Sequence, residues 1–187
     1  MRLSARIDSD CRSMESYFHK LFALLQEGKA EDELAPVEVC DLDSNESHAS
    51  YHRFSHLVKP DMIMNIYSLV DFWLSEICEY HRRNLNLDLG SKDIKGENEL
   101  HARHKYLTTY AGLNLSAVQD SYKKLDDLRN VRNKFIHGGG HIPNDQEKKF
   151  TAINGISLLG TLIIIDNNFV WSMLEHAKKY LQAAALA

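Results

Sequence analysis

The sequence has few cysteines, and they form no pattern. The three thiols, Cys11, Cys40 and Cys78, are odd in number and widely spaced, and no Cys-x-x-Cys pair occurs. This distribution argues against a disulfide framework, a cysteine zinc site and a thioredoxin-like redox site. It is typical of free thiols in a reducing compartment.

Long apolar runs are also missing. No run approaches the roughly 20 apolar residues that a membrane-spanning helix needs. The first ten residues alternate polar and apolar side chains, so they lack the apolar centre of a signal peptide. We therefore predict a cytoplasmic protein with no membrane association.

The chain has no excess of basic charge. Its net charge is −4 and its isoelectric point is about 6.2. Binding to nucleic acid depends on clustered Lys and Arg side chains that neutralise phosphates. Any contact with RNA must therefore come from a local group of basic residues.

Helical periodicity accounts for most of the 187 residues, and with the chain length it predicts one mostly α-helical domain over residues 1–187. The predicted helices cover residues 10–27, 50–58, 61–84, 97–110, 116–137 and 167 onward. Gly28 is expected to end the first helix, and Pro60 to separate the second from the third. Residues 31–46 contain seven acidic side chains and no Lys or Arg, and they predict a loop.

Two further features complete the predicted fold. Residues 61–84 are apolar nearly all round, Phe72 included, which predicts a helix buried on more than one face, at the bundle centre or against a second subunit. After the turn pair Asn154-Gly155, residues 156–165 are β-branched and apolar, which predicts a small β-hairpin before the last helix. Asp166 or Asn167 is expected to cap that helix, and Ser116 with Gln119 matches a capping box for the helix before the hairpin.

A polar cluster ends the helix over residues 116–137, where residues 132–137 run into three glycines. At about 100° per residue, Arg129, Asn133 and His137 share the face opposite the apolar stripe. Arg132 lies at the edge of that stripe, where a guanidinium needs an anionic partner. Asp71, an acidic residue inside an otherwise apolar segment, is the predicted partner in a buried ion pair.

Arg132 and His137 are about 140° apart on a regular helix, so one chain does not point both at one spot. Two copies related by a two-fold axis would bring both sets into one groove. Such a composite site suits RNA cleavage without a metal or cofactor. His137 would exchange protons with the 2′-hydroxyl or the 5′-oxygen, Arg132 would hold the charge on the phosphate, and Asn133 would position the substrate, with Arg129 supporting them. The product would be a 2′,3′-cyclic phosphate.

Residues 128–138 resemble the motif of the HEPN superfamily (higher eukaryotes and prokaryotes nucleotide-binding). That motif has an Arg, then a polar residue, and a His after four to six intervening positions, as in Arg132, Asn133 and His137. The resemblance extends loosely over residues 65–74, where Asp71 matches a frequent acidic position, and over the hairpin and last helix, but not over residues 1–45. It implies a homodimeric, up-and-down helical bundle that acts as an endoribonuclease in toxin–antitoxin or anti-phage systems. RNA is the implied substrate, and an antitoxin such as a nucleotidyltransferase is an implied partner.

The same residues also allow a structural interpretation. Arg132, Asn133 and His137 would then cap the helix and pair with carboxylates, in a non-catalytic HEPN-like binding or scaffold module. The other histidines are expected to lie on solvated surfaces: a four-residue repeat at positions 48, 52 and 56 lacks the further ligands of a metal site. His141 is expected in a mobile loop beyond the glycines.

Overall fold

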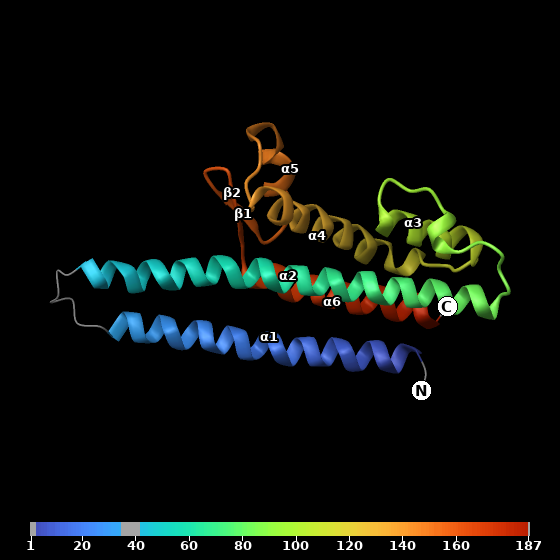
Figure 1. Ribbon diagram of the computed structural model, residues 1–187, viewed down its shortest axis with the longest axis horizontal. Coiled ribbons are helices and arrows are strands. Elements are labelled where there is room, and N and C mark those ends of the chain that lie inside the picture. Colours follow the sequence, from blue (N-terminus) through green and yellow to red (C-terminus); the bar gives the residue numbers. More distant parts are fainter. Residues whose placement is uncertain (1–2, 35–41, 187) are drawn as a thin grey trace.

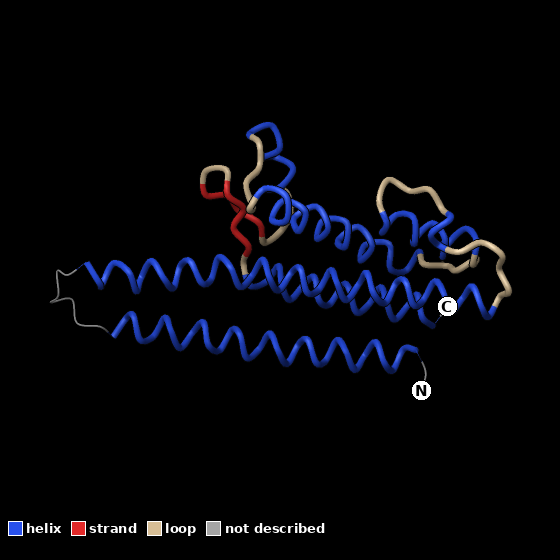
Figure 2. The backbone as a smooth tube through the Cα atoms, viewed as in Figure 1, coloured by secondary structure: helices blue, strands red, loops and turns tan. Residues whose placement is uncertain are grey.

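The computed structural model describes the backbone of residues 3–34 and 42–186, and the side chains of residues 3–25 and 57–186. Within this part the chain forms six α-helices and one antiparallel hairpin before the last helix, which confirms the predicted mostly α-helical bundle (Figures 1 and 2). The elements are α1 (Leu3–Leu34), α2 (Leu42–Asn84), α3 (Glu99–Lys105), α4 (Gln119–Gly138), α5 (Glu147–Thr151), β1 (Ile156–Leu159), β2 (Leu162–Ile165) and α6 (Asn167–Leu186).

Helix α6 forms the centre of the bundle. It packs against α1, α2 and α4, and α1 and α2 also lie side by side along the long axis of the molecule (Figure 1). Its inward face carries Ala177, Tyr180, Leu181 and Ala184, all without solvent exposure. Asp166 begins the helix as predicted, because its Oδ1 accepts a hydrogen bond of 2.7 Å from the backbone N–H of Phe169.

Helix α1 is longer than its sequence predicts. It begins at Leu3 rather than near residue 10 and continues past Gly28 to Leu34. Ile7 and Cys11 extend the buried stripe of Phe18 and Leu25 toward the N-terminus. A single glycine costs a helix only about 1 kcal/mol relative to alanine, so Gly28 alone does not have to end the helix. The predicted acidic loop is wrong for residues 31–34 and 42–46, which are helical, and residues 35–41 lie outside the described residues.

Helix α2 runs without a break through Pro60, so the predicted division into two helices is wrong. Proline removes one backbone hydrogen bond and favours a kink or helix end. Here Pro60 is buried, and Val58, Met62 and Ile63 are buried around it. Because most helical stability in proteins comes from tertiary packing, this contact with the core offsets the lost hydrogen bond.

Helix α4 begins differently from its prediction. The capping box is absent: Ser116 belongs to a short 3-10 turn, and its hydroxyl donates to Asn114 Oδ1 at 2.7 Å. The helix starts at Gln119 without a side-chain cap. It ends as predicted in the glycines, because Gly139 adopts the left-handed conformation with φ of +57°.

The hairpin of β1 and β2 pairs Ile156 with Ile165 and Leu159 with Leu162. The segment that follows α4 forms backbone hydrogen bonds to this hairpin. The N–H of Ile163 donates to Gly140 O, and the N–H of Ile142 donates to Thr161 O, both at 2.9 Å. The prediction of a mobile loop at His141 is therefore wrong, because this residue is bridged to β2 and fixes the end of α4 against the hairpin.

Candidate functional site

A groove of about 740 Å³ lies between α2, α3 and α4. We call it the arginine groove and define it by the side chains that line it most prominently: Tyr67, Asp71, Phe72, Lys92, Glu99, Arg103, Arg129, Arg132 and Asn133. Its α4 wall follows from sequence periodicity, since Leu125, Leu128 and Val131 are fully buried and turn the opposite face outward. Three of the predicted site residues on α4 and the predicted Asp71 therefore meet in one groove.

Arg132 is the arginine of this groove that lacks a carboxylate partner among the described residues. Its Nη1 donates to Asn133 Oδ1 at 3.0 Å, and its Cζ lies 5.2 Å from the centre of the Tyr67 ring. Its Nε is buried and has no hydrogen-bond partner. A guanidinium in this state keeps both charge and donors for an anion.

Tyr67 contacts Arg132 with the face of its ring and does not offer it a negative charge. Burial raises the pKa of its hydroxyl, and the neighbouring carboxylate of Asp71 raises it further. The phenol is therefore neutral at physiological pH. Its contact with Arg132 is a cation–π interaction, which leaves the positive charge uncompensated.

The predicted ion pair between Arg132 and Asp71 is not formed, and this expectation was wrong. Asp71 pairs with Arg103, whose Nη1 contacts its Oδ1 and donates to its backbone carbonyl at 3.0 Å. The Nη2 of Arg103 also pairs with Glu99 at 3.1 Å. The sequence analysis missed Arg103; its one available signal was the four-residue spacing from Glu99 on a predicted helix.

Arg129, the predicted supporting residue, is also neutralised. Its Nε lies 2.8 Å from Asp126 Oδ1, and its Nη2 donates to Asn130 Oδ1 at 3.1 Å. Arg129 thus contributes to the wall of the groove while its charge is matched by a residue on its own helix. This distinguishes it from Arg132.

His137 does not line the arginine groove. It is exposed in the last turn of α4, on the solvent side, as its five-residue separation from Arg132 predicts. The turn that follows is closed by hydrogen bonds from Gly139 N to Phe135 O at 3.2 Å and from Gly140 N to Lys134 O at 3.1 Å. The histidine is therefore held on a well-formed helix end, away from the arginine of its own chain.

The other described histidines near α4 have structural contacts. His104 stacks on Tyr122 with ring centres 3.9 Å apart, and its Nδ1 hydrogen-bonds the Tyr180 hydroxyl at 2.7 Å. His101 Nε2 lies 3.5 Å from Asp126. The side chains of the three histidines at positions 48, 52 and 56 lie outside the described residues. Among the described residues, no group of three or more His, Cys, Asp or Glu side chains is arranged to hold a metal ion.

The fold and this groove define the class of the protein: a mostly α-helical bundle with a hairpin before its last helix and an interhelical groove. One arginine of that groove, Arg132, pairs with no carboxylate of the described residues. Within the described part of the chain, no helix is long and apolar enough to cross a membrane. No family model, no curated protein and no solved structure matches the chain.

Proposed function

We propose that the protein is a metal-independent endoribonuclease of HEPN-like type whose active site forms between two copies of the chain. The observation that carries the proposal is the state of Arg132, which lines a groove and has no carboxylate partner among the described residues. Asn133 beside it supplies a side-chain amide at the same wall. These groups suit a phosphate that gains negative charge during a reaction.

A second copy supplies what one chain does not bring together. His137 is exposed at the end of α4, and its neighbour Ile136 is 44% exposed, an apolar side chain available for contact. If two α4 ends meet about a two-fold axis, His137 of each copy approaches Arg132 of the other. The acid/base and the phosphate-holding group then face one phosphodiester.

The reaction that these residues support is transesterification. His137 accepts the proton of the 2′-hydroxyl, and the 2′-oxygen forms a bond to phosphorus as the bond to the 5′-oxygen breaks. The second His137 donates a proton to the leaving 5′-oxygen. Arg132 stabilises the charge on the phosphorane, and the products are a 2′,3′-cyclic phosphate and a 5′-hydroxyl.

Such an activity belongs to a toxin or a phage-defence protein acting on RNA in the cytoplasm. The proposal therefore includes a protein that restrains it, for which an antitoxin such as a nucleotidyltransferase is the candidate that the resemblance implies. The motif of residues 128–138 supports this assignment, since its Arg, Asn and His occupy the expected spacing.

The test is cleavage of RNA in EDTA by the wild type, Arg132→Ala and His137→Ala. Removing an acid/base or a phosphate-holding group is expected to lower the rate by about 10²-fold or more. Arg83→Ala is the matched control, because Arg83 is exposed and pairs with Glu79 away from the groove. Equal cleavage by all four proteins would exclude these residues as the active site.

The second candidate function is a non-catalytic binding or scaffold module. One observation favours it: in a single chain, Arg132 contacts Tyr67 and Asn133 while His137 points elsewhere. A scaffold would retain its fold and partner binding without cleaving RNA, and sedimentation would show a monomer. A dimer that cleaves RNA with a dependence on both residues would exclude it.

A further inference from the structure

We propose that the arginine groove binds one unpaired nucleotide of a single-stranded RNA, with the base stacked on Phe72 and the adjoining phosphate held by Lys92. The inference rests on the proposed function in one respect, because it takes RNA as the ligand. It assigns a recognition role to two residues outside the HEPN-like motif, on α2 and on the loop before α3.

Phe72 is an aromatic ring exposed in a polar groove. Its side chain is 51% exposed, whereas its neighbours Val70, Trp73 and Leu74 on α2 are each 1% exposed. Its ring meets the Trp73 ring edge-on, with centroids 5.1 Å apart, and Ser68 and Asp71 line the groove beside it. Grooves that bind single strands combine basic side chains with such rings, because every base has a face that stacks on them.

The charges of the groove leave two cations available. Arg103 forms ion pairs with Asp71 and Glu99, and Arg129 forms one with Asp126. Lys92 and Arg132 make no ion pair with any described residue. These two lie on different walls, one on the loop before α3 and the other on α4. Two separate cations and an exposed aromatic ring that line the same groove match two phosphates and one base better than a single small anion.

The backbone that carries Lys92 is held in place by local hydrogen bonds and packing. It belongs to the 3-10 turn Ser91–Asp93, which the N–H of Gly90 closes by donating to Asp93 Oδ2 at 2.8 Å. Farther along, the loop packs on α3 so closely that a Cβ at Gly96 would lie 2.6 Å from the backbone nitrogen of Ala102. Asn98 then caps α3 by accepting from the N–H of His101. The lysine is therefore presented by a preformed loop.

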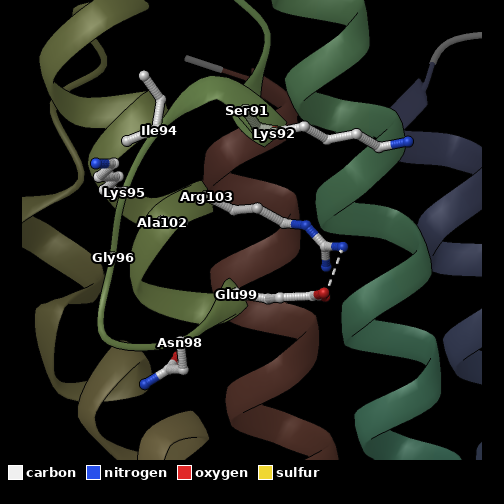
Figure 3. A pocket seen from close by; sticks show the side chains of 9 residues that line it. All are labelled: Ser91, Lys92, Ile94, Lys95, Gly96, Asn98, Glu99, Ala102 and Arg103. Carbon is white, nitrogen blue, oxygen red and sulfur yellow. Dashed lines mark hydrogen bonds and ion pairs between the residues drawn. The ribbon is translucent and has the colours of Figure 1, made fainter.

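A second pocket of about 640 Å³ adjoins the groove on the side of this loop. Lys92, Asn98, Glu99 and Arg103 line both spaces, and Figure 3 shows Lys92 extending from the loop toward α2 above the paired Arg103 and Glu99. Ile94 and Ala102 give the second pocket apolar surface. An RNA strand that places one base on Phe72 would reach this pocket past the residues that line both spaces, Lys92 among them.

The experiment measures binding of a fluorescein-labelled single-stranded RNA of mixed sequence by anisotropy, in the His137→Ala background to prevent cleavage. Phe72→Leu is expected to weaken binding about tenfold because it keeps bulk and loses the aromatic face, and Phe72→Trp is expected to retain it. Lys92→Ala is expected to weaken binding and to reduce the salt dependence by close to one released counterion. An RNA duplex of the same sequence is expected to compete poorly, because its bases are already stacked.

Matched controls come from the same elements. Tyr80→Ala removes an exposed aromatic ring from α2, and Lys105→Ala removes an exposed lysine from α3, and neither residue lines the groove. Both are expected to bind RNA as the His137→Ala parent does. Equal binding by the Phe72 and Lys92 variants and their controls would overturn the nucleotide site.

Two further outcomes separate this inference from the proposed function. Wild-type cleavage together with unaltered RNA binding in Phe72→Leu and Lys92→Ala would leave the nuclease in place and overturn the nucleotide site. RNA binding that depends on both residues, without cleavage by the wild type, would support the nucleotide site and overturn the proposed nuclease activity. If Phe72→Leu loses RNA binding because a dimer dissociates in sedimentation, Phe72 is a subunit contact and the stacking role is overturned.

Discussion

Arg103, rather than Arg132, is the partner of Asp71. One guanidinium nitrogen of Arg103 contacts both the carboxylate and the backbone carbonyl of Asp71, and so ties α3 to α2. The side chain of Arg103 is only 15% exposed. Arg103 pairs with both carboxylates that line the groove, Asp71 and Glu99, and so leaves Arg132 without a neutralising partner among the described residues. The reactivity proposed for Arg132 therefore depends on a residue that the motif does not contain.

Arg103→Ala is expected to lower the free energy of unfolding by about 1 to 2 kcal/mol, because a half-buried carboxylate loses its cation. Urea unfolding measures the change. Arg83→Ala, which breaks an exposed pair with Glu79, is expected to change stability by less than about 1 kcal/mol. If the proposed function is correct, Arg103→Ala also slows RNA cleavage, since Asp71 becomes free to neutralise Arg132. Cleavage at the wild-type rate would show that Arg103 only stabilises the fold.

The half-buried His104 predicts a dependence of stability on pH. Burial lowers its pKa in the folded protein, and the nearby His101 lowers it further. The unfolded chain therefore binds more protons than the folded chain below the ordinary histidine pKa of about 6.5, and stability falls as pH falls through that value. His104→Gln is expected to flatten the slope of unfolding free energy between about pH 7.5 and pH 5.5. Equal slopes for variant and wild type would contradict the assignment.

Much of the core could be predicted from sequence because burial leaves a periodic pattern. Leu125, Leu128 and Val131 recur at helical spacing and are fully buried. The hairpin followed from the β-branched residues 156–165, although the turn that joins its strands is at residues 160–161 and Asn154-Gly155 lies before β1. The cap at Asp166 followed from its position before an apolar stripe. Each of these signals is local, within one element or one turn.

The features that could not be predicted depend on contacts between elements. Periodicity assigned Asp71 to an apolar segment, but it does not say which helix packs there, so Arg103 was missed. Pro60 is a local helix breaker whose effect is offset by burial in the bundle. Phe72 belongs to a segment that is apolar nearly all round, yet it is half exposed, because α3 and α4 leave a groove beside it.

Gly155, immediately before β1, provides a test of the predicted turn. Its φ is +83°, and a Cβ there would lie 2.6 Å from Asp166 Oδ1 and 2.8 Å from Phe169 Cβ. Gly155→Ala is expected to destabilise the protein by about 2 to 4 kcal/mol, through backbone strain together with displacement of the α6 cap. Gly160→Ala is the control: φ is +59° at the hairpin tip, where a Cβ meets nothing within 4 Å, so strain alone applies. Equal thermal shifts in the two variants would show that the contact with the cap is unimportant.

Gly140 links the hairpin to the proposed active site. Its φ is +86°, and a Cβ would lie 2.6 Å from Cε1 of Phe135 and 3.1 Å from Leu162. Phe135 lies between Arg132 and His137 on α4, so Gly140→Ala is expected to displace the helix end that carries the histidine. Gly139→Ala is the matched control, because its φ of +57° imposes similar strain while its Cβ meets nothing within 4 Å.

With the proposed function, Gly140→Ala is expected to lower the RNA cleavage rate about tenfold or more relative to Gly139→Ala, since small displacements of catalytic groups are costly. Cleavage is measured at a temperature where circular dichroism shows both variants folded. Because Gly139 is the residue that caps α4, its variant accounts for any effect of strain at the helix end itself. Equal rates would mean that the packing of Phe135 against the hairpin does not position His137, and that the helix end alone is sufficient.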